Sequence, residues 1–249
     1  MSGAAAAPAW RAIVERASAP YQRSGRFAWH FARGKLRWDP VFNRLIERGL
    51  IAPRTRVLDI GCGQGLLASV VQAAAWTALQ GRWPPGWGQA PVGVRVRGIE
   101  VLARDVARAR DALGDSADFD CADMRTAAFD AVDTVVILDA LHYVSIAEQD
   151  AVLVRVRAAL RAGGRLVLRV GDAAGGSRFA ASRWVDRLVT LVRGQGFGRV
   201  AGRPLAAWRA RLDALGFAVT CEPMASGTPF ANVLLVGTVE RPASVAATE

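Results

Sequence analysis

The sequence predicts an α/β protein with a doubly wound, mostly parallel, seven-stranded sheet, an antiparallel C-terminal hairpin and a helical N-terminal extension. Two observations carry this prediction. Strand-like and helical apolar patterns alternate from about residue 54 onwards, which is typical of a parallel sheet with helices on both faces. The last two strand patterns follow each other without a helix between them, so we expect them to pair antiparallel.

Length and composition suit one well-buried α/β domain. The chain has 249 residues, of which 52% are hydrophobic. We expect a helical extension or cap over residues 1–52, the main domain over 53–241 and a disordered tail over 242–249.

The chain is strongly basic, with a formal net charge of +10 and a pI near 11.1. Such a charge suits nucleic acid, an anionic membrane or acidic substrates. The 32 basic residues include a single lysine, Lys35, and the arginines are dispersed among many alanines. Nucleic-acid binders usually mix in lysine and cluster their charges, so we interpret the excess as compositional bias and predict no specific nucleic-acid partner.

Cysteine and histidine are scarce. With two histidines and no paired cysteines, we predict neither a metal site nor a disulfide framework. The alanine-rich start lacks the basic segment of a targeting signal. Residues 60–81 carry no charge, but they begin in a glycine turn and contain three glutamines, which favours a buried helix over a membrane span. We expect a cytoplasmic protein, and the sequence leaves the oligomeric state open.

The N-terminal extension contains two helical patterns. Asp39 precedes Pro40 as an N-cap before a proline at the first helical position, and the following amphipathic pattern stops before Pro53. Residues 21–38 interleave aromatic and basic side chains. One interpretation is a helix that packs its aromatics on the sheet domain, and the other is a lid or acceptor-binding surface whose arginines hold an anionic group.

The later elements follow in regular order. Ser145 and Glu148 form a capping box for one of the helices, and Gly163-Gly164 is expected to end that helix after Arg161. We predict strands over residues 57–60, 94–100, 132–138, 165–170, 217–222 and 231–239, and a short strand with its loop over residues 117–123. We predict helices over residues 66–78, 102–113, 145–161, 177–193 and 205–215.

The stretch Val-Leu-Asp-Ile-Gly-Cys-Gly-Gln-Gly over residues 57–65 joins the first strand to its helix. Its glycines let the backbone bend sharply and let a ligand lie against main-chain N–H groups at a helix N-terminus. A phosphate loop would need Gly-Lys-Ser/Thr here, and a dinucleotide turn would need a glycine where this chain has Leu66.

The pattern Asp-x-Gly-x-Gly-x-Gly resembles motif I of the class I S-adenosylmethionine (SAM)-dependent methyltransferases. With the parallel sheet and the C-terminal hairpin, the resemblance covers about residues 54–240 and implies a Rossmann-like fold with SAM as cofactor. It implies that Glu100 accepts both ribose hydroxyls, that Asp123 lies near the adenine amine and that Met124 lies beside the ring. The cofactor-binding residues so implied are Asp59, Gly61, Cys62, Gly63, Gly65, Glu100, Val101, Asp123, Met124 and Leu138.

The segment Leu138-Asp-Ala-Leu-His-Tyr143 resembles motif IV of the common small-molecule subgroup, which makes His142 and Tyr143 candidate catalytic residues. His142 is either a general base for a phenolic acceptor or a core histidine satisfied by backbone groups. We interpret Cys62, inside the glycine turn, as small filler and not as a nucleophile. The Trp/Pro/Gly insertion at 81–93 either covers the cofactor, contacts a partner or simply packs.

Motif IV lacks the Pro-Pro-aromatic platform of enzymes that methylate nucleic-acid amino groups. The function we predict is methyl transfer to a small-molecule acceptor, a phenolic or carboxylic natural-product intermediate of secondary metabolism. The alternatives are an RNA or protein methyltransferase, favoured by the charge, and a non-catalytic scaffold of the same fold. Parts of the extension and the C-terminal region also loosely resemble methyltransferases of bacterial aryl-polyene pigment clusters.

Overall fold

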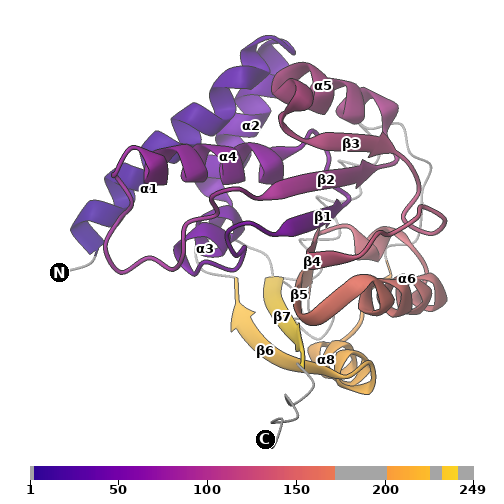
Figure 1. Ribbon diagram of the computed structural model, residues 1–249. Coiled ribbons are helices and arrows are strands. Elements are labelled where there is room, and N and C mark those ends of the chain that lie inside the picture. Colours follow the sequence, from indigo (N-terminus) through magenta and orange to yellow (C-terminus); the bar gives the residue numbers. More distant parts are fainter. Residues whose placement is uncertain (1–2, 172–200, 225–231, 241–249) are drawn as a thin grey trace, which may run out of the picture. The chain divides into compact units, whose positions relative to one another are not determined.

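The computed structural model describes residues 3–171, 201–224 and 232–240 (Figure 1). Within them, seven strands form one sheet in the order β3-β2-β1-β4-β5-β7-β6, which confirms the predicted mixed sheet with a parallel core. The predicted helix at 177–193 and the predicted tail at 242–249 lie outside the described residues.

The strands are β1 (Arg56–Ile60), β2 (Arg95–Glu100), β3 (Asp118–Cys121), β4 (Val132–Leu138), β5 (Leu160–Gly171), β6 (Phe217–Pro223) and β7 (Asn232–Val239). The α-helices are α1 (Gly3–Ser18), α2 (Arg26–Trp38), α3 (Pro40–Glu47), α4 (Leu66–Leu79), α5 (Ala103–Leu113), α6 (Ile146–Ala159) and α8 (Leu205–Ala214). Short 3₁₀ turns are η1 (Ala19–Gln22), η2 (Gly114–Ser116) and η3 (Leu141–Tyr143).

The chain divides into two compact units. The first contains Met1–Ala128 and Val136–Ala140, and the second contains Phe129–Val135 and Leu141–Glu249. The N-terminal extension therefore shares a compact unit with the first three strands and the glycine turn. The boundary that we predicted after residue 52 stays a prediction.

In the first unit, β1 pairs with β2 and β2 with β3, all parallel. Leu58, Ile60 and Ile99 are at most 1% exposed, because an interior parallel strand is covered on both faces. Parallel pairing brings the carboxyl ends of the three strands to one edge, where open α/β sheets bind ligands. The segments that follow Ile60, Glu100 and Cys121 therefore meet at this edge.

The predicted helical extension is confirmed. Asp39 caps α3, since its carboxylate accepts a hydrogen bond from the Val41 N–H at 3.1 Å. Helix α1 packs on α4 and α2. Helix α2 buries Ala28, Ala32 and Leu36, which follow one another at four-residue spacing.

The insertion at 81–93 packs on the end of α3. The Trp83 indole N–H donates to the Gly88 carbonyl at 2.9 Å, and the Trp83 and Trp87 rings meet edge to face at 5.2 Å. The Gly88 N–H donates to the Glu47 carbonyl at 2.8 Å. The insertion leads into the amino end of β2, opposite the edge where β2 ends, so these contacts favour packing over a cover for a ligand.

In the second unit, β6 and β7 pair antiparallel, as predicted, and β7 also pairs antiparallel with β5. The capping box of α6 is also confirmed, because Ser145 and Glu148 exchange side-chain-to-backbone hydrogen bonds. The predicted end of this helix is wrong. Helix α6 ends at Ala159 and β5 begins at Leu160, so the two glycines lie within the strand, where Gly163 has φ +74°.

No helix in the described ranges is long and apolar enough to cross a membrane. Helix α4, which fills most of the uncharged stretch at 60–81, has 14 residues and is largely buried. The same described residues contain no group of three or more histidine, cysteine or acidic side chains that could hold a metal ion.

Candidate functional site

The glycine turn between β1 and α4 has unfilled space at its centre, beside Gly63. Gly63 has φ +54°, a conformation that favours glycine, and a Cβ added to it would meet no atom within 4 Å. Gly61, at φ +75°, lies instead directly against the Cβ of Ala140. The turn is thus tightly packed at Gly61 and has room for a ligand at Gly63.

Glu100, the last residue of β2, is tied to this turn. One carboxylate oxygen accepts the Gly63 N–H at 3.0 Å, and the other accepts the Leu102 N–H at 3.0 Å. The residue is 9% exposed. Each oxygen carries about two acceptor sites, so these backbone bonds leave capacity for two further donors. A vicinal diol supplies two such donors.

Asp59 lies at the same edge and is 4% exposed. Burial is the main cause that raises the pKa of this carboxyl to about 8, and the neighbouring Glu100 carboxylate contributes to the same rise. Asp59 therefore tends to retain its proton near neutral pH, and a cation placed beside it would favour its ionised form.

Cys62 fills a small space under the turn, as predicted, and is 8% exposed. A Cβ on Gly98 would lie 2.7 Å from the Cys62 sulfur and 2.7 Å from Phe119, so glycine at this point of β2 makes room for both. Burial raises the pKa of the Cys62 thiol well above its ordinary value. The thiol is consequently protonated, which argues against a nucleophile.

Asp123 and Met124 follow β3 at the same edge. Ala122 donates its N–H to the Glu100 carbonyl at 3.0 Å, which brings this loop to the end of β2. The Nε and one terminal nitrogen of Arg125 donate hydrogen bonds to the Asp123 carboxylate at 2.6–3.0 Å. These bonds lower the pKa of Asp123. Val101, also predicted at the site, is 53% exposed.

The end of β4 adds Leu138, which is half-buried, and Asp139, whose φ of +56° is uncommon for a residue other than glycine. Lys35 of α2 approaches the Asp139 carboxylate at 3.8 Å and forms a closer ion pair of 2.7 Å with Asp39. The extension thereby contributes a cation beside the end of β4 that the sequence did not single out.

His142 and Tyr143 belong to the second unit, on η3. Their rings lie 4.1 Å apart, and Tyr143 is 37% exposed. The His142 carbonyl accepts the Ala201 N–H at 2.9 Å. The two catalytic assignments stay predictions.

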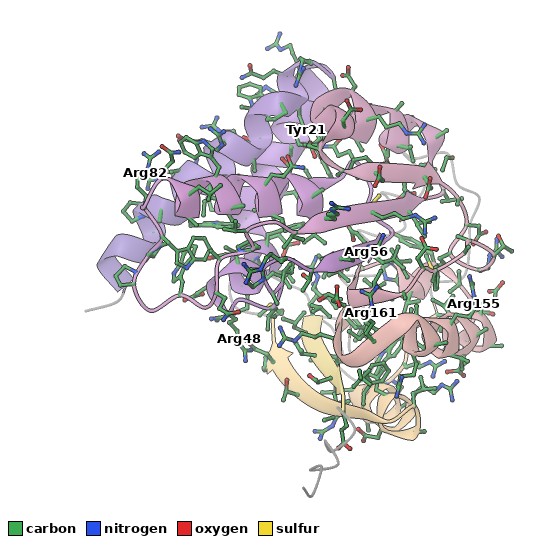
Figure 2. All side chains as sticks on the ribbon, viewed as in Figure 1. Tyr21, Arg48, Arg56, Arg82, Arg155 and Arg161 are labelled. Carbon is green, nitrogen blue, oxygen red and sulfur yellow. The ribbon has the colours of Figure 1, made fainter. Side chains whose placement is uncertain are left out.

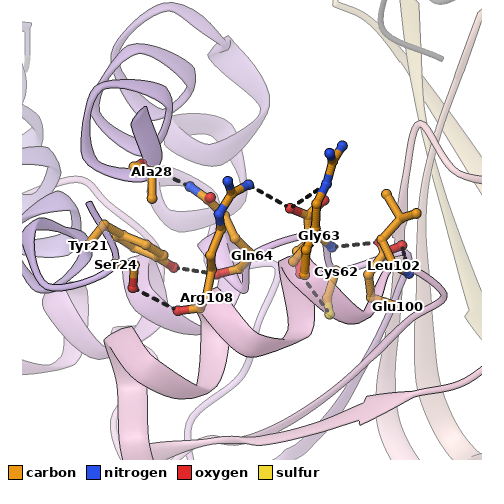
Figure 3. Close-up of polar contacts among 11 residues, drawn as sticks. Tyr21, Ser24, Ala28, Cys62, Gly63, Gln64, Glu100, Leu102 and Arg108 are labelled. Atoms are coloured by element: carbon orange, nitrogen blue, oxygen red, sulfur yellow. Dashed lines mark hydrogen bonds and ion pairs between the residues drawn. The ribbon is translucent and has the colours of Figure 1, made fainter. Parts of the chain in front are cut away.

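The structure adds an unexpected anchor to the turn (Figure 3). The hydroxyl of Tyr21 donates to the Gln64 carbonyl at 2.8 Å, and the Gln64 side chain donates to the Ala28 carbonyl at 3.0 Å. Both side chains are at most 3% exposed. The sequence contained one sign of this anchor, which is Gln64. It is a polar side chain within a buried motif, and a buried polar side chain needs a hydrogen-bond partner.

Four strand or turn segments of the first unit thus surround one edge: the glycine turn, the Glu100 loop, the Asp123 loop and the end of β4. The Asp59 and Glu100 carboxyl groups and the open space at Gly63 suit a ligand with a diol and a positive charge.

Residues 58–166 match the family described as "Methyltransferase domain". No curated protein matches the sequence. Among solved structures, magnesium protoporphyrin IX methyltransferase (ChlM) from Synechocystis PCC 6803 with bound SAH is similar at 20% identity and a TM-score of 0.57, over 86% of this chain and 88% of that one.

Two further structures have the same fold. An O-methyltransferase family protein from Burkholderia thailandensis matches at 18% identity and a TM-score of 0.59, over 88% of this chain and 62% of that one. Mitomycin 7-O-methyltransferase MmcR matches at 21% identity and a TM-score of 0.54, over 75% of this chain and 49% of that one.

Proposed function

We propose that this class I SAM-dependent methyltransferase transfers the methyl group of SAM to a small-molecule acceptor. The acceptor that we propose is a phenolic or carboxylic intermediate of secondary metabolism. The observation that carries the proposal is Glu100, whose two oxygens are fixed by the Gly63 and Leu102 N–H groups. Two of the similar structures bear the names of small-molecule methyltransferases, one for magnesium protoporphyrin IX and one for mitomycin.

The residues present fit the cofactor. Glu100 has acceptor capacity for two ribose hydroxyls, and Gly63 leaves open space beside it. Asp59 lies at the same edge, and a sulfonium or ammonium group placed beside it favours the ionised form of this buried carboxyl. The residues that we propose to contact SAM are Asp59, Gly61, Cys62, Gly63, Gly65, Glu100, Val101, Asp123, Met124 and Leu138.

When bound, SAM supplies an electrophilic methyl group on a sulfonium, so the protein's work is to hold and orient the acceptor. Asp123 must share its carboxylate between Arg125 and an adenine amine. Its bonds to Arg125 are on a partly exposed surface, where such pairs contribute little, so the exchange costs little free energy.

We propose His142 as the general base for a phenolic acceptor, with Tyr143 beside it. A phenol has a pKa of about 10 and needs its proton removed near neutral pH, whereas a carboxylate acceptor is already ionised. His142→Gln should lower turnover of a phenol by about 100- to 10,000-fold with SAM affinity unchanged. Near-normal turnover in a well-folded variant would exclude the base role and leave a packing histidine.

The function is tested by methyl transfer from labelled SAM into fractionated host metabolites and, in parallel, into host RNA and protein. We expect label in a small molecule and its loss in Glu100→Ala. The net charge of +10 favours the second candidate, an RNA or protein methyltransferase. Turnover on RNA or protein above that on any metabolite, at physiological salt, would establish that candidate. SAM binding without transfer to any acceptor would indicate a scaffold.

A further inference from the structure

Helix α2 exposes a line of aromatic side chains. Phe27, Phe31 and Trp38 are 66%, 36% and 75% exposed, and they are three of the eight large hydrophobic side chains exposed among the described residues. Their spacing of four and seven residues places them along one side of the helix, over a length of about 16 Å. Gly34 falls between Phe31 and Trp38, and a Cβ there would meet nothing within 4 Å.

A second, basic line runs beside the first. Arg26, Arg33 and Arg37 are spaced by seven and four residues, and Arg26 and Arg37 are exposed. Residues 16–38 contain no acidic side chain. The third side of α2 is the buried line of small and apolar residues that packs on the protein. The helix therefore presents aromatic and cationic lines together on its exposed surface, which is unlike the dispersed arginines elsewhere.

We propose that this α2 surface, formed by Phe27, Phe31, Trp38, Arg26, Arg33 and Arg37, docks the protein on an anionic lipid bilayer. Aromatic rings enter the boundary between headgroups and acyl chains, while the neighbouring guanidinium groups meet the anionic headgroups. The proposal is independent of methyl transfer, since none of these side chains is assigned to the cofactor.

The ring contacts favour lipid over nucleic acid. The Arg37 guanidinium lies 5.2 Å from the Trp38 ring centre, and Arg108 of α5 lies 5.3 Å from the Phe27 ring centre. Phe27 and Phe31 are themselves stacked, with centres 6.3 Å apart. Single-stranded nucleic acid is held by bases stacked on open ring faces, which these contacts partly occupy. Entry into a lipid interface needs only the exposed ring edges.

The test is co-flotation of the full chain with vesicles of pure phosphatidylcholine and of an equimolar mixture with phosphatidylglycerol. We expect binding to the anionic vesicles only. The variant Phe27→Ser/Phe31→Ser/Trp38→Ser should lose binding by at least about tenfold. The variant Arg26→Gln/Arg33→Gln/Arg37→Gln should lose binding by on the order of 100-fold.

A matched control removes three exposed arginines elsewhere, as Arg11→Gln/Arg95→Gln/Arg209→Gln, and should retain most binding. Melting temperature and SAM affinity check that every variant is folded. The proposal is overturned if the full chain does not float with anionic vesicles, or if the control loses as much binding as the α2 variants. It is equally overturned if an RNA oligonucleotide depends on the three aromatics more strongly than the vesicles do.

Discussion

Glu100 joins two loops at the carboxyl edge of the sheet through the Gly63 and Leu102 N–H groups. A carboxylate in this position shapes the turn before any ligand arrives, so the acceptor sites proposed for the ribose are already oriented. Its neighbour Asp59 has the opposite character, because burial holds its proton. We therefore propose different roles at one site for these two acidic residues on adjacent strands.

Replacing Glu100 should weaken SAM binding strongly. Glu100→Ala removes the two charge-assisted hydrogen bonds that we propose to the ribose, at a cost of about 2–4 kcal/mol, or roughly 30- to 1,000-fold in affinity. Titration calorimetry measures the change. Asp120→Ala on β3, which removes a carboxylate paired with Arg97 at 2.8 Å, is the matched control and should bind normally. Unchanged affinity in Glu100→Ala would refute the ribose assignment.

Asp59 should make stability depend on pH. Its pKa is about 8 in the folded chain against an ordinary value of 3.8, so the folded state binds the extra proton between these values. The stabilisation is complete below about pH 4 and is lost as the pH rises through 8. Chemical denaturation across this range should show the fall, and Asp59→Asn should flatten it. If Asp59→Asn shows the same dependence of stability on pH as the unmodified protein, the raised pKa of Asp59 is not its cause.

At the scale of elements, the N-terminal extension is anchored to the glycine turn. Tyr21 of η1 holds the Gln64 carbonyl, and Ser69 of α4 donates to the Ala17 carbonyl at 2.6 Å. The ends of α1 and α2 are thereby bonded to the turn and to the first turn of α4. The geometry of the turn depends on helices that precede it by some forty residues.

Removing the Tyr21 hydroxyl should affect both folding and cofactor binding. Tyr21→Phe leaves a buried carbonyl without its donor, so we expect the free energy of unfolding to fall by about 1–3 kcal/mol. SAM affinity should fall several-fold, because Gln64 lies in the turn. Thr77→Val, which removes a buried hydroxyl bond to Ala73 at the far end of α4, should lower stability without changing affinity. If Tyr21→Phe and Thr77→Val bind SAM with equal affinity, the Tyr21 hydrogen bond does not influence the cofactor site.

Most elements were predictable, because buried strands such as Val132–Leu138 contain apolar, β-branched runs and caps such as Asp39 and Ser145 have fixed chemistry. The end of α6 was missed, since Gly163 acts inside a strand and not as a helix stop. The edge location of Asp59 and Glu100 follows from parallel strands alone. The Tyr21–Gln64 hydrogen bond could not be predicted, because it joins residues 43 positions apart that no local pattern links.

Over the whole molecule, the arginines come from many separate elements. Arg48, Arg56, Arg82, Arg155 and Arg161, labelled in Figure 2, lie on or beside five of them. Many arginines are engaged locally: Arg16 and Arg82 both lie over the Trp76 ring, and Arg161 pairs with Asp133. A charge of +10 spread in this way attracts polyanions without fixing their register.

Binding to RNA should therefore be weak and independent of sequence. We expect the affinity for a single-stranded oligonucleotide to fall steeply between about 50 and 200 mM salt, with no difference between an oligonucleotide and its shuffled version. Fluorescence anisotropy provides the measurement. A preference for one sequence that persists at the higher salt concentration would instead support a specific RNA acceptor.

Lys35 is the only lysine in the chain, it is 37% exposed, and its ammonium group lies 3.8 Å from Asp139 at the end of β4. Reagents that acylate primary amines accordingly have one side-chain target in this protein, apart from any free α-amino group. That target stands beside the proposed site, so a single fluorophore attached there would sense the local environment in which SAM arrives. The arginine-rich composition thus supplies a selective labelling position without any engineered cysteine.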